Sequence, residues 1–255
     1  MTDTHNIKAV VRYDGTDFAG WQIQPNARTV QEVIESTLAQ LSGADVKISG
    51  AGRTDSGVHA LGQVFNCTWP VDFPLDKLQR ALNKLLEPEI RIESVEVVPD
   101  DFHASFSATG KRYAYAIVQH AHADPFSSRY AWNIGWDVEA GRVEELALAF
   151  VGKHDFAGFC CSGSEAKTTV RMIHDIEIVP GAVVGPADLE NAWTIEYHGQ
   201  GFLYKMVRNL TGTLIDVARG HLPDSAISER LNAPAPYHGY TAPAKGLFMK
   251  EVVYD

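Results

Sequence analysis

The sequence predicts an α+β protein made of two similar halves, each with the element order β-α-β-β-α-β. In the first half, two stretches repeat apolar residues at helical spacing, and the segments around them alternate or carry β-branched residues as strands do. The second half repeats this order loosely. The order is that of the ferredoxin-like arrangement, which has an antiparallel sheet. Because substrate sites often lie between domains, we expect an active-site cleft between the two halves.

The helices of the first half have clear start and stop signals. Thr29 and Glu32 match a capping box before an apolar stripe that ends at Gly43. Pro74 opens a second stripe of leucines, and Pro88 ends it. The strands of this half are expected at residues 7–13, 46–49, 59–69 and 90–98.

The second half is expected to follow the same order with two interruptions. Strands are predicted at residues 113–118, 170–179, 193–197 and 247–254, and helices at 143–151 and 202–218. A Gly/Ser-containing loop at 161–167 and a Pro-rich stretch at 222–243 interrupt them. Gly212 costs its helix about 1 kcal/mol relative to alanine, which indicates close backbone packing. The halves join near residues 100–109, so the predicted domains are 1–105 and 106–255.

Composition is that of a globular protein with an acidic surface. The chain has 255 residues, of which 45% are hydrophobic, and a net charge of −10. Its apolar runs fall short of the roughly 18 residues that span a bilayer, and its first residues are polar, so we expect a cytoplasmic protein. Negative charge disfavours a nucleic-acid partner, because phosphate binding depends on Lys and Arg. An RNA-binding function therefore requires positive charge concentrated in one place.

The cysteines and histidines predict neither disulfides nor a metal. Cys67, Cys160 and Cys161 are too few for a disulfide framework, and the adjacent pair lacks the spacing of a zinc site. The ten histidines show no spacing typical of metal ligands. We expect no metal.

The segment with the most chemical information is the loop at residues 50–59. It has three glycines in eight residues, with Arg53, Thr54 and Asp55 among them. It begins like a dinucleotide fingerprint, but Asp55 stands at the third glycine position and a strand follows instead of a helix. Ser56 lacks the context of a serine-hydrolase nucleophile. By itself, Asp55 is compatible with a simple turn cap, which is a common role of aspartate.

Six motifs in order resemble the tRNA pseudouridine synthase A family over nearly the whole chain. The loop supplies GRTDSGVHA at residues 52–60, where family members often have alanine in place of Ser56. The other five motifs are YDGTDFAGWQ at 13–22, KRY at 111–113, GKHDF at 152–156, FLYKMVRN at 202–209 and APAKGL at 242–247.

The resemblance implies a role for each matching residue. Asp55 corresponds to the essential aspartate, and Arg53 to the arginine that helps extrude the target base. Tyr113 corresponds to the tyrosine that stacks on the uracil, Arg208 to the arginine that pairs with the aspartate, and Leu247 to an apolar residue lining the pocket. It also implies a homodimer that acts on uridines 38, 39 and 40 of the tRNA anticodon stem-loop, without metal or cofactor.

The residue types agree with that chemistry. Uridine and pseudouridine are isomers, so the reaction needs neither a redox cofactor nor an energy source. A carboxylate can attack C1′ of the ribose or C6 of the base, or remove a ribose proton, and the sequence does not choose among these routes. Unstacking the target base costs a few kcal/mol, and stacking on a tyrosine can return about 1–3 kcal/mol of it.

Several assignments stay open at the level of sequence. Tyr113 and Tyr115 share a strand face, so either is a candidate for stacking. Arg208 lies beside the apolar face of its helix, where an arginine needs a partner. Lys111, Arg112 and Lys205 are candidates for binding the RNA backbone, although Lys205 is also compatible with a plain surface position. Together with four further cations of the second half, these three residues predict a basic groove on an acidic body. The four are Lys153, Lys167, Arg171 and Arg208.

Two other functions compete with tRNA uridine isomerisation. The first is the same reaction at other RNA sites. The second is an RNA-binding module without catalysis, in which Asp55 would be dispensable.

Overall fold

The structure is a computed structural model that describes residues 4–71, 74–120, 122, 124–163, 166–184, 191–232 and 237–255. It divides into two compact units. Unit 1 consists of Met1–Thr109 and Met249–Asp255, and unit 2 of Gly110–Phe248. The predicted loop 161–167 and the Pro-rich stretch 222–243 include residues 164–165 and 233–236, which lie outside the described residues. No helix in the described ranges is long and apolar enough to cross a membrane.

Unit 1 follows the order β-α-β-β-α-β predicted for the first half. Its elements are β1 (His5–Tyr13), α1 (Val30–Ser42), β2 (Ser49–Gly50), β3 (His59–Trp69), α2 (Leu75–Leu86) and β4 (Ile90–Val97). One of the two hydrogen bonds of the predicted capping box is confirmed, since the Thr29 side chain accepts from the Glu32 N–H at 3.4 Å.

The predicted strand at 46–49 is wrong for all but its last residue. Residues 45–48 have no strand geometry, and β2 covers only Ser49–Gly50. Side chains of α1 take the backbone bonds that a strand neighbour would make. Glu35 Oε1 accepts from the Ile48 N–H at 3.1 Å, and Gln31 Nε2 donates to the Ile48 carbonyl at 3.3 Å.

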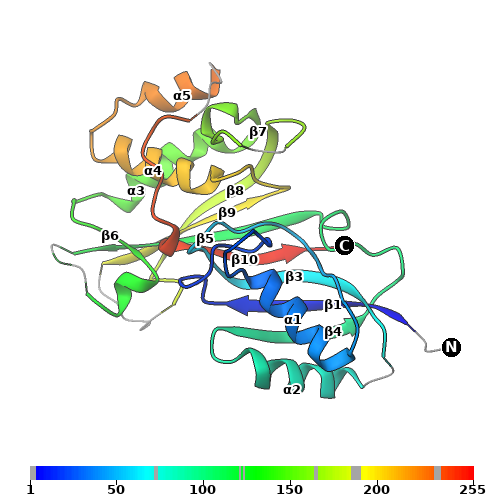
Figure 1. Cartoon of the computed structure of the whole chain (residues 1–255). Coiled ribbons are helices and arrows are strands. Elements are labelled where there is room, and N and C mark those ends of the chain that lie inside the picture. Colours follow the sequence, from blue (N-terminus) through cyan, green and yellow to red (C-terminus); the bar gives the residue numbers. More distant parts are fainter. Residues whose placement is uncertain are drawn as a thin grey trace. The chain divides into compact units, whose positions relative to one another are not determined.

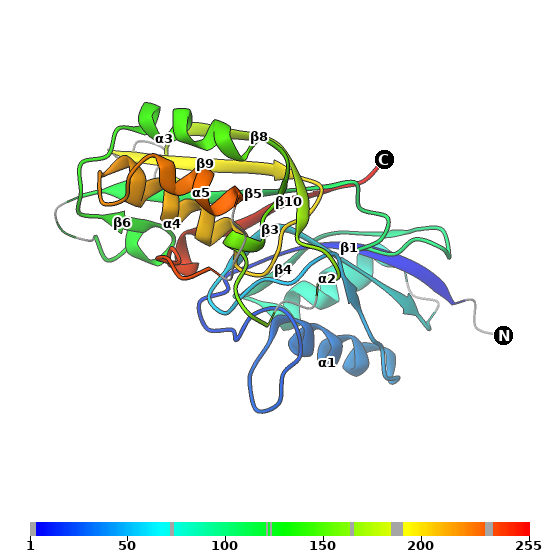
Figure 2. The same cartoon turned by 90° about the horizontal axis from the view of Figure 1, so that it is seen from above.

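The sheet of unit 1 is antiparallel in all its described pairings. β1 pairs with β3 on one side and β4 on the other, and β2 pairs with β3. β10 (Leu247–Val253), whose residues from Met249 belong to unit 1, follows β3 in the strand order. Alternate residues of β1, such as Ile7, Ala9 and Val11, are buried, as expected from the period of two in a strand. Figures 1 and 2 show α1 and α2 together on one face of these strands.

Unit 2 contains mostly antiparallel strand pairs and more helices than predicted. Its strands β5 (Gly110–Gln119), β9 (Ala192–Gly199), β8 (Val170–Pro180) and β7 (Gly152–Asp155) are neighbours in that order, and β6 (Trp132–Ile134) pairs with β5 in parallel. The helices are α3 (Ala140–Ala147), α4 (Met206–Ala218) and α5 (Ser225–Asn232). β6, β7 and α5 were not predicted: the two strands have only three and four residues, too few to show a period, and α5 lies in the stretch expected as a Pro-rich interruption.

The predicted helix at 202–218 begins four residues later than expected. Lys205 has a φ of 58°, in the left-handed region, so the chain turns there and α4 starts at Met206. α4 packs on the buried face of β9, where Tyr197 Oη and Thr211 Oγ1 are 2.8 Å apart. The close packing predicted at Gly212 is confirmed, because a Cβ at this position would lie 2.0 Å from the Tyr240 carbonyl oxygen.

Gly212 and Gly141 should respond in opposite ways to alanine. Gly212→Ala should lower the free energy of unfolding by about 1–3 kcal/mol, because the clash with Tyr240 outweighs the helix propensity of alanine. Gly141→Ala in α3, where nothing lies within 4 Å of the added carbon, should be neutral or stabilise by about 0.4–1 kcal/mol. Urea unfolding followed by circular dichroism measures both. Equal effects of the two substitutions would contradict the close approach.

Candidate functional site

The glycine-rich loop of unit 1 connects β2 to β3 and is anchored at both ends. The Ala51 N–H donates to the Val64 carbonyl at 2.7 Å, and the Val58 N–H closes a turn on the Asp55 carbonyl at 3.1 Å. Thr54 is buried, Asp55 is half-buried and Arg53 is exposed. The loop thus presents two charged side chains on either side of a buried threonine.

The opening motif of the chain holds this loop from outside. The Trp21 N–H donates to the Thr54 carbonyl at 3.1 Å, and the Phe18 carbonyl accepts from the Gly57 N–H at 3.3 Å and from Ser56 Oγ at 3.2 Å. Gly20 has a φ of 96°, and a Cβ there would lie 2.6 Å from the Thr54 carbonyl oxygen. Only glycine fits this conformation and this approach. The motifs at 13–22 and 52–60 therefore form one local structure.

His59 adds a second tie between these two motifs. It is 1% exposed, and its Nδ1 accepts a hydrogen bond from the Gly15 N–H at 3.0 Å. Asp14 Oδ1 lies 3.1 Å from the same nitrogen. Both contacts meet at one ring nitrogen, so His59 at the start of β3 ties the loop to the segment at residues 14–15.

In unit 2, the two candidate tyrosines of β5 have different surroundings. Tyr115 is completely buried and donates from its hydroxyl to the Pro243 carbonyl at 2.7 Å. Tyr113 is 8% exposed, and its ring packs edge-on against Phe202 with centroids 5.1 Å apart. Tyr115 is therefore a core residue whose hydroxyl is already used, while the ring of Tyr113 lies at the border of the core.

Arg208 of α4 is fixed to the last of the six motifs. Its Nε donates to the Ala242 carbonyl at 2.8 Å, and its own carbonyl accepts from the Ala242 N–H at 3.1 Å. Burial raises the pKa of Tyr115 well above its usual range, and the positive charge of Arg208 partly opposes that rise, so the two side chains are near each other. Leu247 follows the short 3₁₀ helix η4 (Ala244–Gly246) and is buried. Unit 2 thus brings together Arg208, Tyr115 and the segment that leads to Leu247.

The candidate RNA-backbone residues of unit 2 lie on β5 and at the start of α4. Burial, and secondarily the nearby charge of Arg171, lowers the pKa of Lys111. Arg112 lies opposite His198 of β9 in the strand register. Lys205 holds its ammonium group 4.9 Å from the centre of the Tyr204 ring. Lys111 and Arg171 therefore place two cations close together on the sheet that carries Tyr113.

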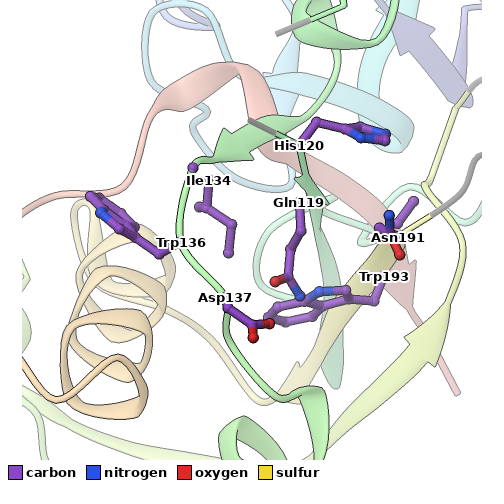
Figure 3. Close-up of a pocket in the computed structure, with 9 residues that line it drawn as sticks. Gln119, His120, Ile134, Trp136, Asp137, Asn191 and Trp193 are labelled. Carbon is purple, nitrogen blue, oxygen red and sulfur yellow. The ribbon is translucent and has the colours of Figure 1, made fainter. Parts of the chain in front are cut away.

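A pocket of about 500 Å³ lies elsewhere in unit 2. Figure 3 shows it between the ends of β5 and β9 and the segment after β6, with Trp193, Asp137 and His120 among the residues that line it. None of the predicted site residues lines this pocket. Among the described residues, no group of three or more His, Cys, Asp and Glu side chains is arranged to hold a metal ion.

The structure adds residues that the sequence interpretation missed. Tyr13 and Gln63 reach the glycine-rich loop from β1 and β3, and Gln63 Nε2 donates to the Gly52 carbonyl at 2.9 Å. One signal was present in the sequence: Gln63 interrupts the otherwise apolar face of its strand, and a buried amide needs partners.

A mixed α/β chain with a carboxylate on a firmly held glycine-rich loop, and with aromatic and cationic side chains on a second unit, has the make-up of an RNA-modifying enzyme. A family model described as tRNA pseudouridine synthase matches residues 9–107 and 146–255. The chain therefore belongs to the tRNA pseudouridine synthase family.

Individual relatives match almost end to end. Proteins named tRNA pseudouridine synthase A from Latilactobacillus sakei and Ruminiclostridium cellulolyticum are 38% and 40% identical to the chain, covering 98% and 97% of it and 99% of their own lengths. One from Bacillus pumilus is 39% identical over 98% of the chain and 99% of its own length. A solved chain titled as an H/ACA RNP bound to a substrate RNA overlaps 83% of this chain and 43% of its own length, at a TM-score of 0.39 and 13% identity, which is too low to support an argument.

Substitution of the two β5 tyrosines should separate stability from turnover. Tyr115→Phe removes the bond to Pro243 and should lower the free energy of unfolding by about 1–3 kcal/mol while turnover is retained. Tyr113→Leu also loses the ring contact with Phe202, so its turnover is measured well below its unfolding midpoint and should fall by roughly 5- to 150-fold, the equivalent of about 1–3 kcal/mol of lost stacking. Tyr113→Phe keeps the ring and serves as the matched control. Larger losses of turnover in Tyr115→Phe than in Tyr113→Leu would reverse the assignment.

Proposed function

We propose that this enzyme isomerises uridine to pseudouridine at positions 38, 39 and 40 of the tRNA anticodon stem-loop, with Asp55 as the nucleophile. Uridine isomerisation in tRNA follows from the family, whose model matches residues in both halves of the chain. One observation supports the role of Asp55: backbone contacts fix the preceding residue, Thr54, and leave Asp55 half-buried at the turn of the loop.

The reaction requires the same base to leave and return. Asp55 attacks the nucleotide, the N1–C1′ bond breaks, the uracil turns, and C5 bonds to C1′ while the C5 hydrogen is released to solvent and N1 gains a proton. Departure of the aspartate completes the isomerisation, so the enzyme returns to its starting state. Tyr113 stacks on the turning ring and Arg53 helps to extrude the base from its stem-loop. Lys111, Arg112 and Lys205 bind phosphates, and Leu247 lines the apolar side of the pocket.

Each half supports its part of the proposed two-domain architecture. We propose ferredoxin-like halves at residues 1–105 and 106–255, the first carrying Asp55 and the second Tyr113 and Arg208. The neighbours β4-β1-β3, with β2 beyond β3, run in the order of a ferredoxin-like sheet, which favours this architecture for the first half. The antiparallel neighbours β5-β9-β8 favour it for the second. Catalysis then requires residues of both halves to act on one uridine.

The proposed partners and location follow from the same family. We propose a homodimer working on tRNA in the cytoplasm. The closeness of Lys111 and Arg171 in unit 2 supports phosphate binding by a chain whose net charge is −10.

The Asp55 side chain should be essential for turnover but not for folding. Asp55→Ala should release no tritium from tRNA labelled at C5 of uridine, while its circular dichroism and its binding of tRNA stay close to those of the parent protein. Asp45→Ala, which removes an exposed carboxylate of the same unit, is the matched control and should keep full activity. Absence of turnover in the parent protein would leave an RNA-binding module as the better hypothesis. Mapping pseudouridine in a deletion strain distinguishes positions 38–40 from other RNA sites.

Arg208 should affect both activity and stability. Arg208→Ala loses the bond from Nε to Ala242 as well as the proposed pairing with Asp55, so the free energy of unfolding should fall by about 1–3 kcal/mol. Turnover measured well below the unfolding temperature should fall by at least 100-fold. Arg208→Lys keeps the charge but not the planar donor set, and its activity should lie between those of the parent protein and Arg208→Ala. An Arg208→Ala protein that is folded and fully active would exclude the pairing as a requirement.

A further inference from the structure

A buried polar network lies directly beneath the loop that carries Asp55. Tyr13 Oη, from β1, and Thr54 Oγ1 are 2.8 Å apart, and both residues are buried. Burial raises the pKa of Tyr13 above its usual range, so the phenol is neutral and can both donate and accept at physiological pH. The Trp21 ring packs beside Tyr13 with centroids 6.0 Å apart, and the Trp21 N–H binds the Thr54 carbonyl.

Gln63 of β3 completes the network from the other side. Its Nε2 donates to the Gly52 carbonyl at 2.9 Å, and its Oε1 accepts from the Val64 N–H at 3.1 Å. Its side chain also lies near enough to Tyr13 to affect the pKa of the phenol. Gln63 thereby fixes the loop at Gly52, while Tyr13 fixes it at Thr54.

This network flanks Arg53, assigned to base extrusion, and Asp55, assigned to catalysis. Arg53 lies between its two anchor points, and Asp55 follows the second one by a single peptide unit. Since Thr54 is bound at its hydroxyl and at its carbonyl, its side chain and backbone are both fixed. A rotation at Thr54 would change the direction of the Asp55 carboxylate.

The surroundings of the network are apolar, which separates positioning from stability. The buried neighbours of Tyr13 on β1 and of Gln63 on β3 include Val11, Phe65 and Cys67. Burying hydroxyl and amide groups in such a core costs desolvation that their hydrogen bonds only offset. Replacing both members of a hydrogen-bonded pair by apolar groups of similar shape can be nearly neutral for stability. Folding alone therefore gives little reason for this network.

We propose that Tyr13 and Gln63 are positioning residues that hold the Asp55 carboxylate in its reactive direction, Tyr13 through the Thr54 hydroxyl and Gln63 through the Gly52 carbonyl. The inference rests on the proposed function, since it assigns these residues to the same reaction. It predicts that loss of the Thr54 hydroxyl lowers kcat, whereas KM changes little because phosphate-binding residues are untouched.

Isosteric variants test the proposal by tritium release from C5-labelled tRNA. Thr54→Val and Tyr13→Phe should each lower kcat on the order of 10- to 100-fold, as expected for a misplaced reacting group, with KM within about threefold of the parent value. Thr54→Ser restores the hydroxyl and should recover kcat to within about threefold. Thr37→Val, which removes an equally buried hydroxyl bonded to the Val33 carbonyl in α1, is the matched control and should leave kcat unchanged.

The double variant Tyr13→Phe/Thr54→Val distinguishes positioning from a structural role. Its unfolding midpoint should recover toward that of the parent, because no hydroxyl is left without its partner, while kcat stays low. Recovery of kcat together with the midpoint, or a Thr54→Val kcat within twofold of the parent, would overturn the inference and leave the proposed function intact. No turnover by the parent protein would instead refute the proposed function. Hydrogen exchange at the amides of residues 53–57 tests whether the Thr54 hydroxyl fixes the loop. Unchanged exchange in Thr54→Val would refute this part of the inference.

Discussion

The approach of the backbone at Gly20 and Trp21 to the Thr54 carbonyl is the constraint on which the candidate site of unit 1 depends. The Trp21 N–H binds this oxygen, and Gly20 lets the two chains come close enough for the bond. Any side chain at residue 20 would push Thr54 away and change the direction of the next residue, Asp55. A backbone contact therefore determines the placement of the side chain proposed as the nucleophile, which explains why two motifs 30 residues apart in the sequence form one local structure.

Unit 2 uses the same principle around α4. Gly212 lets the Tyr240 carbonyl approach the helix, and Arg208, one turn earlier, makes two hydrogen bonds to Ala242. The segment from Tyr240 to Ala242 is thereby held against the helix, and Tyr115 binds the next residue, Pro243. Arg208 consequently has a structural task beside its proposed catalytic one. A functional effect of its removal has meaning only when stability is measured on the same variant.

The sequence predicted those features that depend on local pattern and missed those that depend on long-range partners. The helices at 30–42 and 75–86 and the strand at 59–69 follow from caps, prolines and periodicity within a few residues. The strand at 46–49 failed because side chains of α1 bind the backbone of Ile48. The start of α4 moved because Lys205 adopts a left-handed conformation, which a residue with a Cβ does not signal in advance.

The candidate residues show the same division. The loop with Asp55 was identified from its glycines and charges, whereas the partners of its neighbour Thr54 come from β1 and from β3. Tyr113 and Tyr115 are equivalent in a strand pattern, and the structure distinguishes them by the complete burial of Tyr115 and its bond to Pro243. A pattern reports which face a side chain occupies, but hydrogen-bond partners far along the chain decide whether its polar group is already used.

The chemistry assigned to Asp55 explains why so many contacts serve one loop. A carboxylate is a weak nucleophile, and a reaction that depends on it gains most from holding the reacting atoms in line at short range, which is worth up to about 7–11 kcal/mol when alignment is good. That gain is lost if the carboxylate rotates freely. Backbone bonds to Trp21 and Phe18 restrict the loop from outside, and Tyr13 and Gln63 restrict it from the core. The rigidity of the residues around Asp55 is therefore as much a part of the proposed mechanism as the carboxylate itself.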